Sequence, residues 1–456
     1  MKRSRLLVAA LALVAASFVS CKEGRPRVPS GSQSPRVVSA ISERYDRFGV
    51  VGRTSGDAAT RLLDELAVGW IRIPVNWSQI EPRSGSYNWK EVSGAVSSQT
   101  RTRPGLHVMV TLRAKSQWAG RRTTGKVSEK ATVPPRDLDA YYDFVYGMAT
   151  RGAGTVSCWQ IENEMEGQSW WHGTSEDYLA LLRTAHQAVR AADPSAQVAL
   201  GGFTSQSSTV ATFASRGASE AEIARELGSD KGRAAPGVAS RLRRNQEFMD
   251  DVLKHGQAYF DVVDLHLYHR YETIPMRVEW LRGKMEEYGY EKPIWATEVG
   301  GPDPLVAPHD ESVQAQEVIK RVSLALASGV DKVFWLGLTE MANQGDRFHR
   351  MGLTAVGGRL KPAFRAYQLS VRKLADLPPS SSLDIPGGYG LRFEKGSRVL
   401  WVLWADRGAR IALQTNAPQV RLTHADGSEE RRTTAEGSLE LRLTADPVFV
   451  EAVPGP

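Results

Sequence analysis

Residues 156–167 read VSCWQIENEMEG, so an apolar run passes directly into three carboxylates at alternating positions, Glu162, Glu164 and Glu166. The run has the length and composition of a strand, and Cys158 within it is expected to be a small buried apolar residue. Acids this dense at a strand end can mark a solvated end, a metal site or one half of a catalytic pair. Which of these three interpretations holds depends on the residues that the other strands place near these acids.

Seven further apolar runs of strand length lie between about residues 47 and 375. Helix-like segments such as DAATRLLDELA (57–67) and ESVQAQEVIKRVSLALASG (311–329) separate them, with apolar residues at spacings of three and four. Eight strand–helix units in roughly 330 residues predict an α/β fold, a (β/α)8 TIM barrel. A doubly wound open sheet is the alternative, but FGVVGRTSGD (48–57) does not match its glycine-rich phosphate loop.

The pattern changes near residue 378, which divides the chain into two predicted domains. Short alternating runs broken by Gly, Asn and Asp predict a small antiparallel β-sandwich over 379–456, after a barrel over 43–378. Residues 203–247 form a polar segment longer than a barrel loop needs. This insertion is expected to be a lid, a wall of the substrate cleft or a decoration without a chemical role.

The N-terminal residues 1–21, MKRSRLLVAALALVAASFVSC, combine a basic start with an apolar stretch of signal-peptide length. The residues around Cys21 resemble a bacterial lipobox, and Cys21 stands at the position of the cysteine that is lipidated there. Residues 22–42 have the composition of a linker. We therefore expect an exported lipoprotein, anchored to a membrane and facing the periplasm or the cell exterior. Ordinary cleavage and release is the alternative.

Composition narrows the classes of partner. The chain is 41% hydrophobic and 24% charged, which is typical of a globular protein with a sizeable core. Its net charge is +7, but Lys and Arg are scattered, which favours a solvated basic surface over nucleic-acid binding. With Cys158 as the only cysteine besides Cys21, a structural disulfide is not expected. We expect a monomer.

A barrel of this kind carries its active site at the carboxyl ends of its strands. The fourth strand ends in Glu162–Glu164 and the seventh in Thr297–Glu298, so two glutamates are expected to face one pocket. Paired carboxylates perform acid–base and nucleophilic work on a glycosidic bond. The other residues expected at this mouth are Arg72, His266, Tyr268 and Trp335.

These motifs resemble those of clan A glycoside hydrolases, the retaining (β/α)8 enzymes, with families 39 and 5 the most similar. WQIENEMEG (159–167) resembles the clan's W-E-I-x-N-E-P, although Met165 replaces the proline, and KPIWATEVGG (292–301) resembles K-P-I-W-x-T-E-x-G. The segments WIRIPVNWSQIEPRSGSYNW (70–89) and DVVDLHLY (261–268) are similar to its second and sixth strands. The resemblance covers about residues 47–375.

The resemblance implies a role for each matched residue. Glu164 takes the acid/base position, Glu298 the nucleophile position, and Asn163 that of the asparagine which binds the sugar 2-hydroxyl. Arg72 matches the arginine near the nucleophile, His266 and Tyr268 match residues that touch the nucleophile or the sugar, and Trp335 matches the aromatic platform under the sugar. Double displacement follows, without a metal or organic cofactor.

Structural alternatives accompany several of these residues. Glu162 is expected to be a buried supporting acid paired with Arg72 or Arg113, and Glu166 a loop acid in solvent or on substrate. Trp171 and Trp118 are predicted to stack on sugar, with packing of the barrel rim as the alternative. The histidines lack the i, i+4 spacing of a helical metal site.

Two functions remain open at this stage. The first is a retaining hydrolase of β-glycosidic bonds in a polysaccharide or glycan, and the second is a non-catalytic carbohydrate-binding barrel lipoprotein. Glucose, xylose, mannose, galactose and uronic acid units are all compatible with the residues above. The separation of the two carboxyl groups would discriminate between the two functions.

Overall fold

The computed structural model describes residues 46–52, 57–90, 105–227, 238–304, 308–341 and 348–453. The predicted signal peptide with Cys21 and the linker 22–42 lie outside the described residues. Among the residues described, no helix has both the length and the hydrophobicity needed to cross a membrane.

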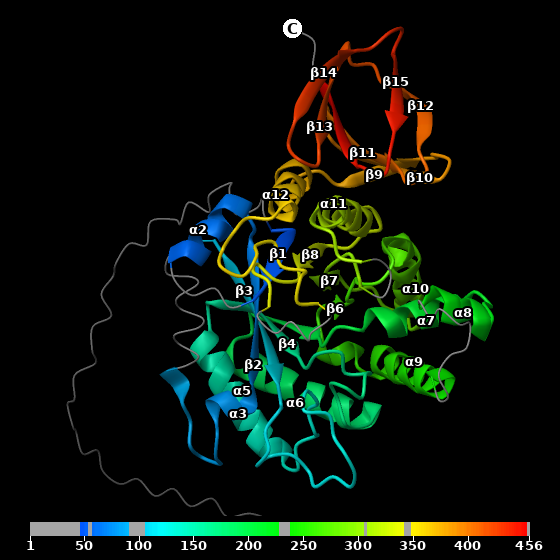
Figure 1. Ribbon diagram of the computed structural model, residues 1–456. Coiled ribbons are helices and arrows are strands. Elements are labelled where there is room, and N and C mark those ends of the chain that lie inside the picture. The colour runs from blue at the N-terminus through cyan, green and yellow to red at the C-terminus, as the bar shows by residue number, and fades with distance from the viewer. Residues whose placement is uncertain are drawn as a thin grey trace, which may run out of the picture. The chain divides into compact units, whose positions relative to one another are not determined.

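Eight parallel strands form one sheet in the order β5-β4-β3-β2-β1-β8-β7-β6. Isolated parallel bridges, Ala199 to Val262 and Phe203 to Leu265, join the two outer strands and bring the sheet to a nearly closed barrel. Figure 1 shows the strands surrounded by helices, which confirms the predicted TIM-barrel fold. The strands are β1 (Phe48–Val51), β2 (Trp70–Asn76), β3 (His107–Arg113), β4 (Val156–Ile161), β5 (Gln197–Leu200), β6 (Val263–Asp264), β7 (Ile294–Val299) and β8 (Lys332–Trp335).

The helices follow the strands as the apolar periodicity predicts, with amphipathic faces on the sheet. Several start at side-chain caps, for example Asp137 before α5 and Thr174 before α6. The helices are α2 (Asp57–Leu66), α3 (Trp77–Ile80), α5 (Leu138–Gly152), α6 (Ser175–Ala192), α7 (Ser205–Ser215), α8 (Glu220–Glu226), α9 (Val238–His255), α10 (Ile274–Glu287), α11 (Glu311–Ala327) and α12 (Pro362–Leu374), with short 3-10 turns at Gln257–Tyr259 and Tyr271–Thr273.

The barrel interior is layered, because side chains two residues apart share one face of a strand. Its lowest layer is apolar and consists of Trp70, Met109, Cys158, Ala199, Val262, Trp295 and Phe334. Two residues further along five of these strands, the interior becomes polar, with Arg72, Thr111, Gln160, Asp264 and Thr297, all at most 3% exposed. Buried polar groups require hydrogen-bond partners, and this layer forms the floor of the site described below.

The predicted insertion 203–247 is largely helical where it is described: it contains α7, α8 and the beginning of α9. Thr204 caps α7 by accepting a hydrogen bond from the amide of Ser207 at 3.1 Å. Most residues of the first two turns of α7 are buried, including Ser205 and Ser208. α7 therefore packs beside the end of β6, where Ser205 Oγ donates to the carbonyl of His266 at 2.8 Å, and the role as lid, cleft wall or decoration stays a prediction.

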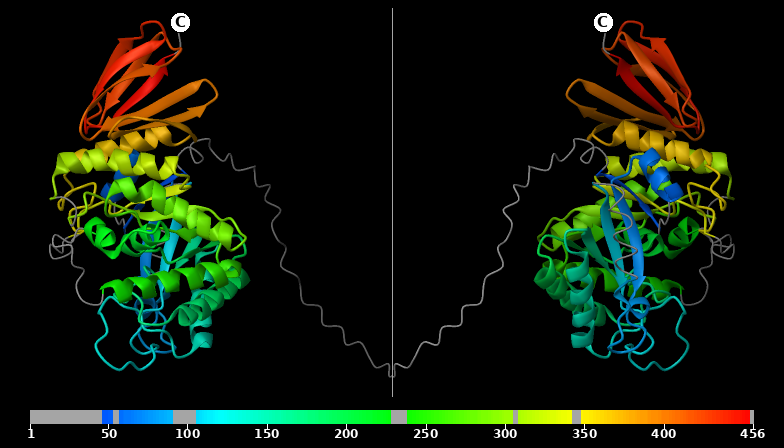
Figure 2. Two further views of the ribbon diagram at one scale, coloured as in Figure 1. Left: turned by 90° about the vertical axis from the view of Figure 1, so that its right-hand side faces the viewer. Right: turned by 90° about the vertical axis from the view of Figure 1, so that its left-hand side faces the viewer.

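The C-terminal strands form a sandwich-like domain, as predicted. A six-stranded antiparallel sheet in the order β14-β13-β16-β11-β10-β9 faces a two-stranded ribbon, β12-β15, and Figure 2 shows these strands beside α11 and α12. Along β11, Trp401 and Leu403 join the core under the ribbon, whereas Val402 and Trp404 join the core shared with the barrel. The strands are β9 (Pro379–Leu383), β10 (Gly388–Lys395), β11 (Arg398–Ala405), β12 (Ala409–Gln414), β13 (Gln419–His424), β14 (Glu429–Thr433), β15 (Ser438–Leu443) and β16 (Val448–Val453).

Candidate active site

The backbone leaves the extended conformation immediately after β4. Glu162 and Glu164 have φ angles of 67° and 48°, a left-handed conformation that costs a non-glycine residue about 1–3 kcal/mol. Three consecutive side chains can therefore point to three different partners at the barrel mouth. The alternation of side chains between the two faces of the strand ends at Ile161, so it does not extend to Glu162 and Glu164.

Glu162 is fully buried and supports the strand ends. Its Oε1 accepts a hydrogen bond from the amide of Ala114 at 2.5 Å, its Oε2 accepts one from Thr132 Oγ1 at 2.8 Å, and Arg113 Nε lies 3.6 Å away. Burial raises the pKa of Glu162, and the charge of Arg113 opposes this rise only in part. The predicted structural role is confirmed, with Arg113 rather than Arg72 as its cation.

Glu298 lies near the end of β7 and is held by hydrogen bonds from Arg72 and Tyr268 and by an ion pair with His266. Arg72 Nη1 is 2.5 Å from its Oε1, the Tyr268 hydroxyl donates to its Oε2 at 2.6 Å, and His266 Nδ1 lies 3.5 Å from Oε2. Burial alone would raise the pKa of Glu298. The charges of His266 and Arg72, with hydrogen bonds from Tyr268 and Arg72, outweigh burial and lower this pKa to about 2.

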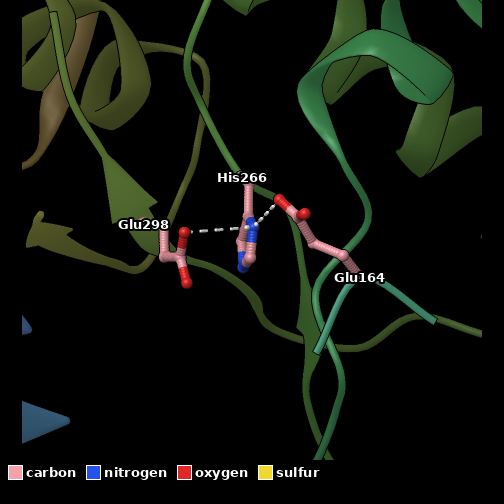
Figure 3. Close-up of side chains that lie close together, drawn as sticks. All are labelled: Glu164, His266 and Glu298. Atoms are coloured by element: carbon pink, nitrogen blue, oxygen red, sulfur yellow. Dashed lines mark hydrogen bonds and ion pairs between the residues drawn. The ribbon is translucent and has the colours of Figure 1, made fainter. Parts of the chain in front are cut away.

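His266 lies between the two predicted catalytic glutamates (Figure 3). Its Nδ1 is 2.8 Å from Glu164 Oε1 and 3.5 Å from Glu298 Oε2, and the three donor atoms lie within 4.8 Å of one another. Burial lowers the pKa of this imidazole, but the negative charge of Glu298 and the carboxylates of Asp264 and Glu164 raise it to about 10. A protonated His266 therefore screens the two acids from each other.

Arg72 connects Glu298 to the floor of the site. Besides Glu298, its Nη2 donates to Asn163 Oδ1 at 2.7 Å, and its Nε donates to Thr111 Oγ1 and Gln160 Oε1 at 2.9 and 2.8 Å. Each of the three guanidinium nitrogens of Arg72 thus donates to a group at or below the barrel mouth, which fixes the guanidinium in one orientation.

Gln160 extends this floor toward His266. Its Nε2 donates to Asp264 Oδ2 at 2.5 Å, and Asp264 in turn accepts from the amide and the hydroxyl of Thr297. Thr111, Gln160 and Asp264 were not among the residues predicted for the site. The available signal was their spacing, because each stands two residues after an apolar residue that faces into the barrel.

Gly202 allows His266 to sit against Asp264. Its φ of +76° suits glycine, and a Cβ there would lie 2.3 Å from His266 Nε2 and 2.6 Å from Asp264 Oδ2. His266 Nε2 itself is buried without a hydrogen bond, 3.6 Å from Asp264 Oδ2. Any side chain at position 202 would push His266 out of this place.

Trp335, predicted to be the aromatic platform under the sugar, does not face the site. Trp335 points outward: its Nε1 donates to the carbonyl of Met351 at 2.8 Å and its ring packs near Tyr367 of α12. The prediction for Trp335 was wrong because Phe334 faces into the barrel, so Leu336 is the inward residue at the end of this strand. Phe348 stacks on Tyr268 instead, with ring centroids 4.5 Å apart.

Trp171, in the loop after β4, and Trp118, in the loop after β3, both pack against neighbouring residues. Trp171 is 1% exposed and its Nε1 donates to the carbonyl of Thr174, so the predicted stacking on sugar was wrong. Trp118 is half-buried, lies edge-on to Trp77 and donates to the carbonyl of Glu81, which fits the packing alternative.

Glu166 also differs from its prediction as a solvated or substrate-contacting acid. It is 3% exposed, its Oε1 accepts from the amide of Thr204 at 2.7 Å, and its Oε2 is buried without a hydrogen bond. Burial raises the pKa of Glu166. Glu166 ties the loop after β4 to the start of α7.

Glu164, His266 and Glu298 also form a set that could hold a metal ion, given the spacing of their donor atoms. Both oxygens of Glu298 are already engaged, one by Arg72 Nη1 at 2.5 Å and the other by the Tyr268 hydroxyl at 2.6 Å, and the cation of Arg72 lies beside the position that a metal ion would take. The chemistry of this donor set therefore favours proton transfer and nucleophilic attack over metal binding.

Comparisons with known proteins find glycoside hydrolases that are similar to this chain in fold and in part of its sequence. Residues 229–367 match a family described as "Glycosyl hydrolase catalytic core". A family 39 glycoside hydrolase from the gut symbiont Bacteroides cellulosilyticus WH2 aligns over 90% of this chain and 82% of its own, with a TM-score of 0.67 and 18% identity. The chain has the fold of these enzymes.

Two other solved structures show the same barrel. A family 30 endoxylanase from Clostridium papyrosolvens C71 aligns over 90% of this chain and 96% of its own, with a TM-score of 0.59 and 11% identity. A family 39 β-xylosidase from Caulobacter crescentus aligns over 90% and 97%, with a TM-score of 0.57 and 15% identity. No curated protein matches the chain.

Proposed function

We propose that this protein is a retaining glycoside hydrolase that cleaves β-glycosidic bonds by double displacement. The observation that carries the proposal is the spacing of the two glutamates, since carboxylate oxygens of Glu164 and Glu298 lie within 4.8 Å of each other. Retaining enzymes hold their carboxyl groups about 5–5.5 Å apart, whereas inverting enzymes need about 6.5–9.5 Å to admit a water molecule.

In the first step Glu298 attacks the anomeric carbon while Glu164 gives its proton to the departing glycosidic oxygen. Glu298 is suited to attack because its lowered pKa keeps it ionised at any physiological pH. His266 donates from Nδ1 to Glu164 Oε1, so the proton for the leaving group is carried on Oε2. The bond to the leaving oxygen breaks as the bond to Glu298 forms.

In the second step Glu164, now ionised, removes a proton from water, and the water oxygen displaces Glu298 from the anomeric carbon. Glu298 then leaves as a carboxylate. Arg72 and the Tyr268 hydroxyl are already placed to stabilise that charge, at 2.5 and 2.6 Å from its two oxygens.

Asn163 is placed to bind the sugar beside Glu164. Arg72 holds the Asn163 amide oxygen at 2.7 Å, so the amide NH2 is the group left to donate to a hydroxyl. A bond to the sugar 2-hydroxyl would strengthen as the reacting carbon gains oxocarbenium character.

The names of the similar structures suggest where to look for a substrate. They include a β-xylosidase and an endoxylanase, so aryl β-xylosides and β-linked xylan are the first substrates to test. A non-catalytic carbohydrate-binding barrel would not need two carboxylates at retaining distance with one of them held ionised, and we therefore favour the enzyme.

The proposal is tested by comparing wild type with two variants on a panel of activated aryl β-glycosides. Glu298→Ala should abolish turnover. Glu164→Ala should slow substrates with poor leaving groups most, and added azide should restore turnover and yield a β-glycosyl azide. Glu279→Ala, which removes an exposed glutamate on α10, is the matched control and should match wild type. Turnover at wild-type rates in both catalytic variants would refute the assignment.

We also propose that the protein is exported and lipidated at Cys21. The proposal is supported by the basic and apolar start of residues 1–21 and by the small residues before Cys21. Labelled fatty acid should be incorporated by wild type expressed in a bacterial host and not by Cys21→Ser. Equal labelling of both would contradict lipidation at this residue.

A further inference from the structure

The segment His266–His269 carries two of the residues around Glu298, yet it continues a strand of only two residues, β6. Its amides are paired with neighbouring elements: His266 N donates to the carbonyl of Phe203 at 2.9 Å and Leu267 N to that of Glu298 at 2.8 Å. Ser205 Oγ accepts from the amide of Tyr268 at 2.6 Å. Ser205 Oγ also donates to the carbonyl of His266 at 2.8 Å, and two arginines supply the remaining donors to the carbonyls of this segment.

Two arginines take four consecutive carbonyls in alternation. Arg277 of α10 donates from Nη2 to the carbonyl of His266 and from Nη1 to that of Tyr268, the latter at 3.3 Å. Arg321 of α11 donates from Nη1 to the carbonyl of Leu267 at 3.3 Å and from Nη2 to that of His269. Successive carbonyls of an extended chain point in opposite directions, so the two guanidinium groups hold the segment from two sides.

Both guanidinium groups are buried, with Arg277 0% and Arg321 1% exposed. Arg321 pairs with Glu317 at 2.5 Å, whereas the ion pairs within the described ranges include none for Arg277. Burial, together with the charge of Arg321, lowers the pKa of Arg277 to about 9, which still leaves it protonated at neutral pH. A buried cation without an acid is costly, so this arrangement is poorly explained by stability alone.

We propose that Arg277 and Arg321 form a carbonyl clamp that positions His266 and Tyr268 against the two glutamates. The clamp fixes the positions of His266 and Tyr268, because it binds the backbone carbonyls of these two residues. It also secures His269, which has a φ of 64° at the end of the segment. The inference rests on the proposed glycosidase mechanism for its effect on rate, but the positioning of His266 can be measured in the free protein.

The decisive measurement is the titration of His266 by NMR on histidine-labelled protein, for wild type, Arg277→Met and Arg277→Lys. If the clamp fails in Arg277→Met, His266 moves away from Glu164 and Glu298, and its pKa falls from about 10 toward the ordinary value by at least about one pH unit. Removal of a positive charge without movement would change the same pKa in the opposite direction, because a nearby cation disfavours the protonated imidazole. An unchanged or raised midpoint in folded Arg277→Met overturns the clamp.

Rate provides the second readout. A displacement of about 1 Å near reacting groups costs about 10²-fold, so we expect kcat of Arg277→Met to fall about 10²-fold with little change in KM. Arg277→Lys keeps the charge but can reach only one carbonyl, so its kcat and its His266 midpoint should lie between those of wild type and Arg277→Met.

Arg190→Met is the matched control, because Arg190 also donates to a backbone carbonyl, that of Ala196, but near the amino ends of β5 and β6. It should leave the His266 midpoint and kcat as in wild type. Thermal unfolding of each variant identifies any variant that does not fold. If Arg277→Met does not fold, the test rests on Arg277→Lys: a lowered titration midpoint of His266 supports the clamp and an unchanged one overturns it. Inactivity of the wild type would refute the glycosidase, whereas an active wild type with an unmoved midpoint would refute only the clamp.

Discussion

Replacement of Tyr268 by Phe removes a single oxygen and should change the ionisation of Glu298, the proposed nucleophile. That oxygen donates to Glu298 Oε2 at 2.6 Å, and the ring itself is held by stacking on Phe348 at 4.5 Å, so the substitution should leave the ring in place. Burial raises the pKa of Glu298, and this hydrogen bond is one of the interactions that lower it to about 2. Its loss should therefore raise the pKa of Glu298.

The expected size follows from the strength of such bonds. A hydrogen bond to a charged group contributes about 1.5–3 kcal/mol, and one pKa unit corresponds to about 1.4 kcal/mol, so the shift is about one to two units. The pKa of Glu298 should then lie at about 3 to 4 in Tyr268→Phe. Since catalysis needs Glu298 ionised, activity is lost as the pH falls through this value, and the acidic limb moves into the measurable range.

The assay is the pH dependence of kcat/KM on an activated aryl β-glycoside from pH 3 to pH 8, because kcat/KM reports groups of the free enzyme. Tyr271→Phe is the matched control: Tyr271 lies three residues further along and bonds Asp406 of the C-terminal domain rather than a catalytic carboxylate. Its acidic limb should superimpose on that of wild type. Acidic limbs of wild type and Tyr268→Phe that superimpose would refute the reasoning about Glu298.

Three other predictions follow from the described contacts. Trp335→Phe should lower the free energy of unfolding by about 1–3 kcal/mol and leave KM unchanged, because Trp335 packs outside the barrel; a raised KM would contradict this placement. Glu162→Gln should lower the midpoint of thermal unfolding, since it leaves Arg113 buried without its charged partner, and an unchanged midpoint would show that the pair is dispensable. The stabilising contribution of protonated His266 is complete below about pH 6.5 and is lost as the pH rises toward 10. The free energy of unfolding of wild type should therefore decline over this pH range more steeply than that of His266→Gln, as measured by parallel denaturation curves. Equal slopes would argue against the raised pKa.

The sequence predicts the barrel and the glutamate pair because both depend on local patterns. Apolar runs of strand length alternate with helical periodicity, and the carboxyl ends of parallel strands must meet at one edge, so Glu164 and Glu298 could be brought together across 134 residues of chain. The same alternation, applied from Phe334, would have placed Leu336 rather than Trp335 at the mouth.

Other features depend on contacts between distant segments, which no local pattern reports. Glu166 is buried where its carboxylate accepts a hydrogen bond from the amide of Thr204, 38 residues further along the chain. Trp171 is buried where its backbone pairs with that of Thr132. Arg277 and Arg321 lie in helices α10 and α11, where the sequence pattern is that of charged residues on a solvent-exposed face. Only the tertiary structure shows that both side chains contact the segment after β6.

The most direct test of the retaining mechanism is the anomeric configuration of the first product. Hydrolysis of an aryl β-glycoside, followed by proton NMR from the earliest time points, should show the β-anomer of the free sugar before mutarotation produces the α-anomer. The spacing of Glu164 and Glu298 within 4.8 Å predicts this retention. Appearance of the α-anomer first would mean inversion and would contradict the central claim.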